Sequence, residues 1–432
     1  MTDQPAADPH IAPAVYMTRD IPGTGGSIKQ RPEDFLVDEM PAYQPGGEGE
    51  HIYLFVEKRN LSTVEAARII AGHFGVDPDS VGFAGMKDRI AITRQLFSVH
   101  TPGKKPEDFP QLTHDRLQVQ WADRHTNKLR VGHLVGNRFS IRIRQVGIGQ
   151  VRHARAALDR LAVTGVPNRF GPQRFGRALN NHLVGRALIR SEFDQAIGLL
   201  LAPEVETTAA HADAKKLYLD GRYADALAAL PRTSYPERSV LRALSRGEKP
   251  GRAIKTLDRT TLRFFLSAFQ SAVFNAVLDQ RLLAGTFDRL QPGDVAFKHD
   301  SRACFDVDES VAADPTTPER LARFEISPSG PMWSSDMRRA SGAIGEAEVN
   351  ALLGMGVTLE QLGAFCRSAG QLIEGARRPL RVPLSFPELE AGADEHGEYI
   401  RVAFDLPRGS FATVALEEIM KTSGTSAEEE DA

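Results

Sequence analysis

The sequence predicts an α+β protein in which one domain is interrupted by another. Three observations lead to this fold class. Strand-like and helical patterns are mixed through roughly the first 165 residues, the pattern is mainly helical from about residue 182 to 285, and strand-like segments return near residue 377. A chain of 432 residues is long enough for two or three domains with buried cores. We therefore expect two parts of the chain, far apart in sequence, to form one domain around an insert.

The first part begins with two strand candidates, residues 33–40 (EDFLVDEM) and 51–59 (HIYLFVEKR). A helix is predicted next, because Ser62 and Glu65 have the spacing of a capping box and Gly75 can end the helix. Residues 77–89 (DPDSVGFAGMKDR) are rich in turn formers and lead to a third strand at 94–99 (RQLFSV).

Residues 138–144 (RFSIRIR) alternate between apolar and polar side chains, which predicts a strand with one buried face. Phe139 is on the apolar side, whereas Arg138, Arg142 and Arg144 are on the other. An arginine-bearing strand face is either an exposed sheet surface or a track for phosphates, and both interpretations remain open. A helix is predicted over 150–163, ending at Gly165.

Helical patterns then dominate, including residues 221–230 and the long apolar segment 260–283. Residues 290–345 are rich in Pro, Gly and Asp. Strand patterns return at 377–384 (RRPLRVPL) and 398–407 (EYIRVAFDLP). Residues 1–20 and the acidic tail 422–432 have the composition of disordered segments.

Composition excludes several classes of protein. The start of the chain has no basic and apolar signal pattern, and no stretch approaches the ~20 apolar residues of a membrane span. The two cysteines, Cys304 and Cys366, are far apart, which suits a reducing cytoplasm and argues against a disulfide framework. No HExxH or paired CxxC motif occurs. We expect a cytoplasmic protein with no membrane and no metal.

Charge is unevenly distributed along the chain. Residues 124–191 contain fourteen Lys and Arg residues and one acidic residue, Asp159, although the whole chain has a net charge of −3. Such a basic window is the electrostatic pattern expected of a protein that binds a phosphate backbone. The alternative is a set of solvated arginines on unrelated faces.

One carboxylate, Asp88, lies between two cations in Gly85-Met86-Lys87-Asp88-Arg89. The loop is not a phosphate-binding loop, because the GxxxxGK[ST] spacing is absent. Nearby cations favour the ionised form of Asp88, which could then act as a nucleophile at an anomeric carbon or as a general base. A structural ion pair explains the same pattern, and the local sequence does not choose between these interpretations.

A second motif repeats Arg-Phe-Gly, at Arg169-Phe170-Gly171 and Arg174-Phe175-Gly176, with Arg177 next to it. Interleaved arginine and aromatic residues suit stacking on nucleotides with neutralisation of phosphates. A structured connector with phenylalanines in the core is the alternative.

Several segments in the same order resemble the TruD family of tRNA pseudouridine synthases. The N-terminal segment is similar to the family's K-x-x-PEDF, and the loop is similar to its G-x-KD-x-x-A-x-T-x-Q signature. The matching residues are Lys29, Pro32–Phe35, Gly85, Lys87, Asp88, Ala91, Thr93, Gln95, Gly136–Phe139, Asn168–Gly176, Arg377–Pro379 and Gly409–Thr413.

The resemblance implies a pseudouridine-synthase catalytic domain with a bent, largely antiparallel mixed sheet, formed by residues 21–165 and 377–421. It implies an inserted α/β TRUD domain at 166–376. It also implies roles for individual residues. Asp88 would be catalytic, assisted by Lys87 and Lys29. The target nucleotide would contact Phe35, Asn137 and Phe411, with Phe139 lining the pocket.

The implied reaction is the isomerisation of uridine to pseudouridine in tRNA, at position 13, without a cofactor. Combined with the basic window, it leads us to expect RNA contacts from Arg142, Arg144, Arg169, Arg174 and Arg177. We expect a monomer, since no self-complementary apolar stripe stands out. Two other functions stay open: an RNA-binding or folding helper without activity, and a hydrolase that releases free uracil.

Overall fold

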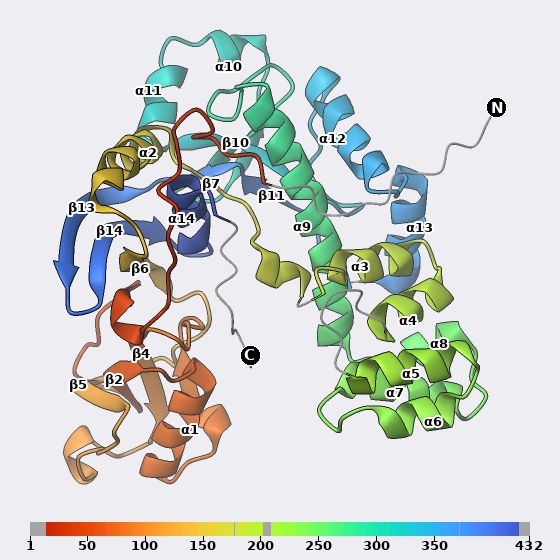
Figure 1. The fold of residues 1–432 in the computed structure, drawn as a ribbon, viewed down its shortest axis with the longest axis horizontal. Coiled ribbons are helices and arrows are strands. Elements are labelled where there is room, and N and C mark those ends of the chain that lie inside the picture. The colour runs from red at the N-terminus through yellow and green to blue at the C-terminus, as the bar shows by residue number, and fades with distance from the viewer. Residues whose placement is uncertain (1–13, 177, 202–208, 371, 423–432) are drawn as a thin grey trace. The chain divides into compact units, whose positions relative to one another are not determined.

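A computed structural model describes residues 14–176, 178–201, 209–370 and 372–422 (Figure 1). The chain divides into two compact units. The sheet unit consists of Tyr16–Val166 and Val382–Ala432, and the helical unit consists of Met1–Val15 and Pro167–Arg381. The chain passes between the units at three points: between Val15 and Tyr16, within the short strand β7 (Val166–Pro167) and within the short strand β12 (Arg381–Val382). The sequence predicts an insertion at residues 166–376, and in the structure the chain enters the helical unit at Pro167 and leaves it after Arg381.

The start of the sheet unit is ordered, so the expectation of disorder over residues 1–20 is wrong around Thr18. Thr18 is fully buried, and its backbone N–H donates to Glu418 at 2.9 Å. The N–H of Met17 donates to the other oxygen of the same carboxylate at 2.8 Å. Two neighbouring amides satisfied by one buried carboxylate hold this segment in place. Residues 1–13, and the expected acidic tail from residue 423 onwards, lie outside the described residues.

An eight-stranded sheet forms the core of the sheet unit, in the order β13-β14-β6-β1-β4-β2-β5, with β3 paired to β4. The β1–β4 pair is parallel and the other pairs are antiparallel. Both chain segments contribute, because β13 and β14 come from the C-terminal one. The strands are β1 (Phe35–Pro41), β2 (His51–Arg59), β3 (Val81–Phe83), β4 (Ile92–His100), β5 (Leu117–His125), β6 (Leu134–Arg144), β13 (Ser385–Asp394) and β14 (Gly397–Pro407).

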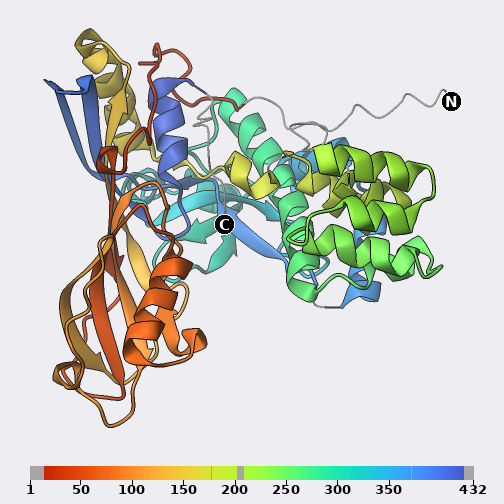
Figure 2. The ribbon, with the colours of Figure 1, turned by 60° about the horizontal axis from the view of Figure 1, so that its bottom comes forward.

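Three helices cover one face of this sheet: α1 (Thr63–Phe74), α2 (Val151–Thr164) and α14 (Ala412–Met420). Helix α1 packs on β2 and β4, whereas α2 and α14 pack on β6 and β14. Figure 2 shows α1 and α14 on the same side of the sheet. Among the described residues no helix packs on the opposite side, which we call the helix-free face. The site described below lies on the helix-bearing face, on β1 and β6, between these two packed regions.

The local predictions for this unit are confirmed. Strands occur at 33–40, 51–59, 94–99 and 138–144 to within a few residues. Helix α1 starts at the capping box of Ser62 and Glu65. It ends at Gly75, whose φ of 65° is in the left-handed region that glycine adopts without strain. Helix α2 ends before Gly165, as its sequence predicts.

The helical unit is built around α9 (Arg259–Leu283) and a four-stranded sheet in the order β11-β10-β8-β9. Its strands are β8 (Val295–Lys298), β9 (Cys304–Asp306), β10 (Ile326–Met332) and β11 (Ala376–Pro379). Its other helices are α3 (Asn181–Ile189), α4 (Phe193–Leu201), α5 (Ala209–Leu219), α6 (Tyr223–Ala229), α7 (Tyr235–Leu244), α8 (Pro250–Ile254), α10 (Glu309–Ala313), α11 (Thr317–Ala322), α12 (Gly342–Gly354) and α13 (Leu359–Ala369).

Helix α9 is long and apolar enough to cross a membrane by length and composition, as is the bent pair α12 and α13 if the two count as one span. Buried positions make up 67% of the most apolar stretch of α9. Phe269, Val273 and Leu266 of this helix belong to the hydrophobic cluster of the helical unit. This burial is that of a core helix.

Candidate functional site

The loop that carries Asp88 connects β3 to β4 and is braced by hydrogen bonds. The side-chain amide of Gln95, on β4, donates to the carbonyl of Gly85 at 3.2 Å. The hydroxyl of Thr63, the first residue of α1, donates to the Gln95 carbonyl oxygen at 3.1 Å. The same hydroxyl accepts the backbone N–H of Lys87 at 2.9 Å. Thr63 and Gln95 are fully buried, so these bonds hold the loop against two rigid elements.

Lys58, on β2, also holds the loop that carries Asp88. Its side chain is fully buried on β2, and its ammonium donates to the backbone carbonyls of Leu61 at 2.5 Å and Asp88 at 3.0 Å. Burial lowers the pKa of Lys58 to about 8, partly offset by the nearby Asp88. Neither Lys58 nor Thr63 was predicted as a site residue, because both occupy ordinary positions in a predicted strand and helix.

Lys29 forms an ion pair with Asp88. The distance from Lys29 Nζ to Asp88 Oδ1 is 2.9 Å, and the two side chains are 4% and 35% exposed. Lys29 has a φ of 58°, a left-handed conformation that is strained for a residue with a side chain. Its ammonium also lies 4.9 Å from the ring centroid of Phe35, a cation–π distance. The catalytic candidate is therefore paired on one side and partly open on the other.

Lys87 points to different partners, although it precedes Asp88 in the chain. Its ammonium lies 2.8 Å from Glu39 Oε2 and donates to Asn137 Oδ1 at 2.5 Å. Both side chains of the Lys87–Glu39 pair are nearly inaccessible, at 4% and 0% exposure. Within the described residues, the lysine paired with the Asp88 carboxylate is thus Lys29. The sequence had left open which of the two lysines it would be.

The aromatic residues expected at the site differ in exposure. Phe35 is 1% exposed and Phe139 is 6% exposed, and their rings meet edge to face at 6.5 Å. Both belong to the hydrophobic cluster under α2 and α14. Phe411 is 40% exposed at the N-terminal end of α14, next to Ala412 of the same cluster. The structure thus brings Lys29, Phe35 and Phe139 together and leaves Phe411 open to solvent.

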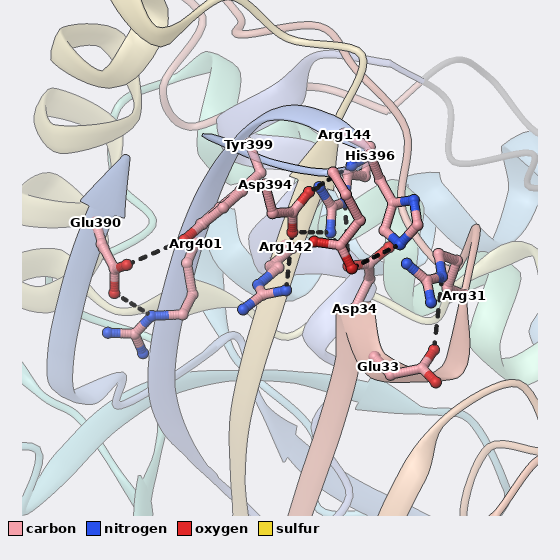
Figure 3. Close-up of polar contacts among 11 residues, drawn as sticks. Arg31, Glu33, Asp34, Arg142, Arg144, Glu390, Asp394, His396, Tyr399 and Arg401 are labelled. Carbon is pink, nitrogen blue, oxygen red and sulfur yellow. Dashed lines mark hydrogen bonds and ion pairs between the residues drawn. The ribbon is translucent and has the colours of Figure 1, made fainter. Parts of the chain in front are cut away.

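On the helix-free face, the arginines of β6 are matched by carboxylates (Figure 3). Arg144 is buried and donates to Asp34 at 2.7 Å and to Asp394 at 2.7 Å. Arg142 is 36% exposed, pairs with Asp394 at 3.2 Å, and lies over the ring of Tyr399 at 4.6 Å. Its hydrogen bonds with Arg144 lower the pKa of the Asp394 carboxyl. A guanidinium enclosed like that of Arg144 is not accessible to a phosphate, whereas part of Arg142 is.

The arginines of the helical unit also differ from one another. Arg169 is buried and pairs with Asp279, one of its two contacts being 3.1 Å long. Arg174 is half-buried, and burial lowers its pKa. Its guanidinium lies 5.8 Å from the ring of Phe170 and 5.7 Å from that of Phe264. Arg177 lies outside the described residues.

The chemistry available at this site is that of a carboxylate beside an ammonium, with a second ammonium and an amide close by in the fold. Such a carboxylate can attack a carbon or accept a proton. Among the residues that the structure describes, no group of three or more His, Cys, Asp or Glu side chains is arranged to hold a metal ion.

Comparisons with known proteins point to one family. The sequence model of tRNA pseudouridine synthase D (TruD) matches residues 12–419. The tRNA pseudouridine synthase D of Geobacter sp. (strain M21) is 44% identical over 411 residues, which is 95% of this chain and 100% of that protein. That of Geobacter sulfurreducens is 42% identical over 414 residues, or 95% of this chain and 98% of that protein.

A solved structure shows the same likeness in three dimensions. The crystal structure of a Methanosarcina mazei protein that carries the TruD name superposes with a TM-score of 0.82 at 27% sequence identity. The match covers 95% of this chain and 97% of that one. Sequence and fold therefore agree over nearly the whole chain, including the helical unit.

Proposed function

The chain belongs to the TruD family of tRNA pseudouridine synthases, and we propose that it isomerises uridine 13 of tRNA to pseudouridine with Asp88 as the catalytic carboxylate. The observation that carries this proposal is the ion pair of Asp88 with Lys29, in which the carboxylate keeps 35% of its surface exposed. A catalytic carboxylate has to be both oriented and reachable, and this one is.

The reaction is an isomerisation, so its atoms balance within the substrate. The C1′–N1 bond breaks, the uracil turns, a C5–C1′ bond forms, C5 loses its proton, and N1 ends as N–H. Asp88 can take part by attacking C1′ or by removing a proton from the sugar. Both routes need the carboxylate at the sugar of the target nucleotide. No electron donor or acceptor is consumed, and the proposal includes no cofactor.

The target base has to leave its stack to reach Asp88, at a cost of a few kcal/mol. In this proposal, Phe411 stacks on the extruded base, because an exposed aromatic ring can take up that role. Phe35 and Phe139 form the apolar floor of the pocket. Apolar walls also exclude water while the base is detached, and water at that stage would release free uracil.

The RNA contacts of this proposal come from partly accessible arginines, with Arg142 in the sheet unit and Arg174 in the helical unit. The enzyme acts as a cytoplasmic monomer. Binding that depends on phosphate contacts falls steeply with salt, because counterions are released on association.

The first experiment compares wild type with Asp88→Asn on transcript tRNA. We expect pseudouridine at position 13 with wild type, and a loss of at least about 10³-fold in rate with the variant, the scale for removing a group that reacts directly. Glu348→Gln, a buried glutamate in the helical unit, is the control and should keep normal activity.

Three outcomes would contradict the proposal. Undiminished product from Asp88→Asn would remove Asp88 from the mechanism. Release of free uracil would indicate a hydrolase, and tRNA binding with no change in any uridine would indicate an RNA-binding helper.

A further inference from the structure

Glu39 and Asn137 lie directly opposite each other in the antiparallel β1–β6 pair. Directly opposite residues of neighbouring strands point to the same face. Here that is the face of Phe35 and Phe139, since Val37 is paired with Phe139 in the same register. The ammonium of Lys87 bridges the pair, at 2.8 Å from Glu39 Oε2 and 2.5 Å from Asn137 Oδ1.

Glu39 is held more firmly than an ordinary ion-pair partner. Its side chain is fully buried, and its second oxygen, Oε1, accepts the backbone N–H of Leu96 on β4 at 3.1 Å. The Glu39 carboxylate on β1 is thus hydrogen-bonded to β4 and linked to Asn137 on β6 through Lys87. The adjacent Gly136 keeps β6 close to β14, because a Cβ at that position would lie 2.2 Å from the carbonyl oxygen of Leu406. The backbone next to Asn137 is thus tightly positioned.

This arrangement determines which way the Asn137 amide points. An ammonium has three donors and no acceptor, so the Asn137 atom that faces Lys87 has to be the carbonyl oxygen. The amide group Nδ2 then points away from Lys87. Asn137 is half-buried, and no hydrogen bond from its Nδ2 occurs within the part of the chain that the structure describes.

We propose that Glu39 is a positioning residue: through Lys87 it fixes Asn137 so that Nδ2 donates a hydrogen bond to a carbonyl oxygen of the target uracil. The inference rests on the proposed function. A donor at O2 or O4 stabilises the negative charge that develops on uracil when the C1′–N1 bond breaks. Because the carbonyl oxygen of Asn137 is occupied, this side chain offers the base a donor and not an acceptor.

The arrangement also explains why a charged glutamate is buried there. Removing one partner of a buried ion pair leaves the other charge uncompensated, which is costly. Without Glu39, the Lys87 ammonium loses the carboxylate that holds it between the strands, and the Asn137 amide can rotate. The loss is then one of orientation at the base, while the rest of the RNA contacts remain.

The test is a chemical cycle that combines protein variants with modified substrates. Single-turnover rates and tRNA Kd values are measured with uridine, 2-thiouridine or 4-thiouridine at the target position. Sulfur is a weaker acceptor than oxygen, so for wild type we expect about a 10- to 100-fold lower rate with one of the two thio substrates, the scale of a hydrogen bond to a developing charge.

In Asn137→Asp the shape is kept and the donor is lost. We expect its thio effect to fall to within about twofold of unity, because the bond is already missing. Glu39→Gln should lower the rate with uridine and show the same reduced thio effect, while the tRNA Kd changes by less than about threefold. A residue with only a structural role would not remove the thio effect.

Glu348→Gln is the matched control. Glu348 is also buried, at 3% side-chain exposure, and pairs with Arg377 at 2.6 Å, but it lies in the helical unit. This variant should keep the full thio effect. If Glu39→Gln does not fold, Lys87→Met breaks the same connection and should give the same result.

The inference fails if Glu39→Gln, Lys87→Met or Asn137→Asp keeps the full thio effect, or if neither thio substrate slows wild type. A wild-type protein that forms no pseudouridine with the uridine substrate would instead overturn the proposed function. The two failures are therefore distinguished in one experiment.

Discussion

Asp88 and Asp34 are both aspartates of the sheet unit that pair with a cation from a distant segment, yet their surroundings are opposite. Asp88 is 35% exposed and meets the single ammonium of Lys29 through Oδ1. Asp34 is 1% exposed, and its Oδ1 accepts both Nε and Nη2 of Arg144, at 3.1 and 2.7 Å. Arg144 in turn donates to Asp394.

The difference separates a reactive arrangement from a structural one. A planar guanidinium gripped by two carboxylates is rigid and closed. A lysine ammonium is a point charge, which can orient a carboxylate while leaving one side of it accessible.

The largest effect on stability is expected from Asp34→Asn. The variant leaves the positive charge of the buried Arg144 paired with Asp394 alone. Breaking a buried ion pair costs about 3–5 kcal/mol. Urea unfolding measures the loss, and pseudouridine formation below the transition should stay within a few-fold of wild type. A stable but inactive Asp34→Asn protein would break the comparison, because it would place Asp34 in the reaction.

Local pattern was sufficient for most of the sheet unit. The alternation in β2 and β6, the capping box of α1 and the glycine after it depend on residues close in sequence, so their prediction from sequence succeeded. The alternation in β6 left two interpretations of its arginines open, an exposed sheet face and a track for phosphates. Burial of Arg144 could not be foreseen, because its partners Asp34 and Asp394 are 110 and 250 positions away.

Only the site residues that lie in recognisable sequence motifs could be predicted. Asp88 and Lys29 lie in recognisable segments, whereas Glu39 and Lys58 are single charged residues in strand patterns, where solvent exposure is the default expectation. Their burial follows from the pairing of β1 with β6 and of β2 with β4. Strand register is a long-range property that one sequence does not determine.

Lys29→Met tests the Asp88 ion pair by removing its cation. Without its ammonium Asp88 loses its orientation, and we expect the single-turnover rate to fall about 100-fold with little change in tRNA Kd. Lys421→Met is a close control: Lys421 also has a positive φ, 55°, and pairs with a carboxylate, Glu418, at 3.7 Å. It should retain activity. Equal rates for wild type and Lys29→Met would reduce Lys29 to a structural role.

The buried Lys58 predicts a pH dependence of stability. Its folded pKa is about 8, below the unfolded value of ~10.4. Between these values the unfolded chain binds a proton that the folded chain has lost, so this residue's contribution to stability rises with pH and falls as pH drops through about 8. The charged groups that act on it are Asp88, Lys87 and Glu65.

The measurement is the difference in unfolding free energy between wild type and Lys58→Met. We expect it to shift in favour of wild type by about 1–2 kcal/mol from pH 8 to 9.5, a window within the pKa shift. A difference that stays flat over this range would mean that Lys58 keeps its proton. Taking the difference removes groups that titrate equally in both proteins.

Arg142→Gln is expected to have the smallest effect on stability. It tests the partly exposed arginine beside the buried Arg144 pairs. Because Arg142 is 36% exposed and its pair with Asp394 is 3.2 Å long, we expect a stability loss below about 1 kcal/mol. If Arg142 contacts a phosphate, the slope of log Kd against log salt falls by about one unit in the variant. Glu390→Gln, which loses an exposed pair with Arg401 on the same face, should not lower that slope. An unchanged slope in Arg142→Gln would mean that Asp394 already neutralises this arginine. Arg142 would then have a structural role, and the phosphate contacts would have to come from other cations of the chain.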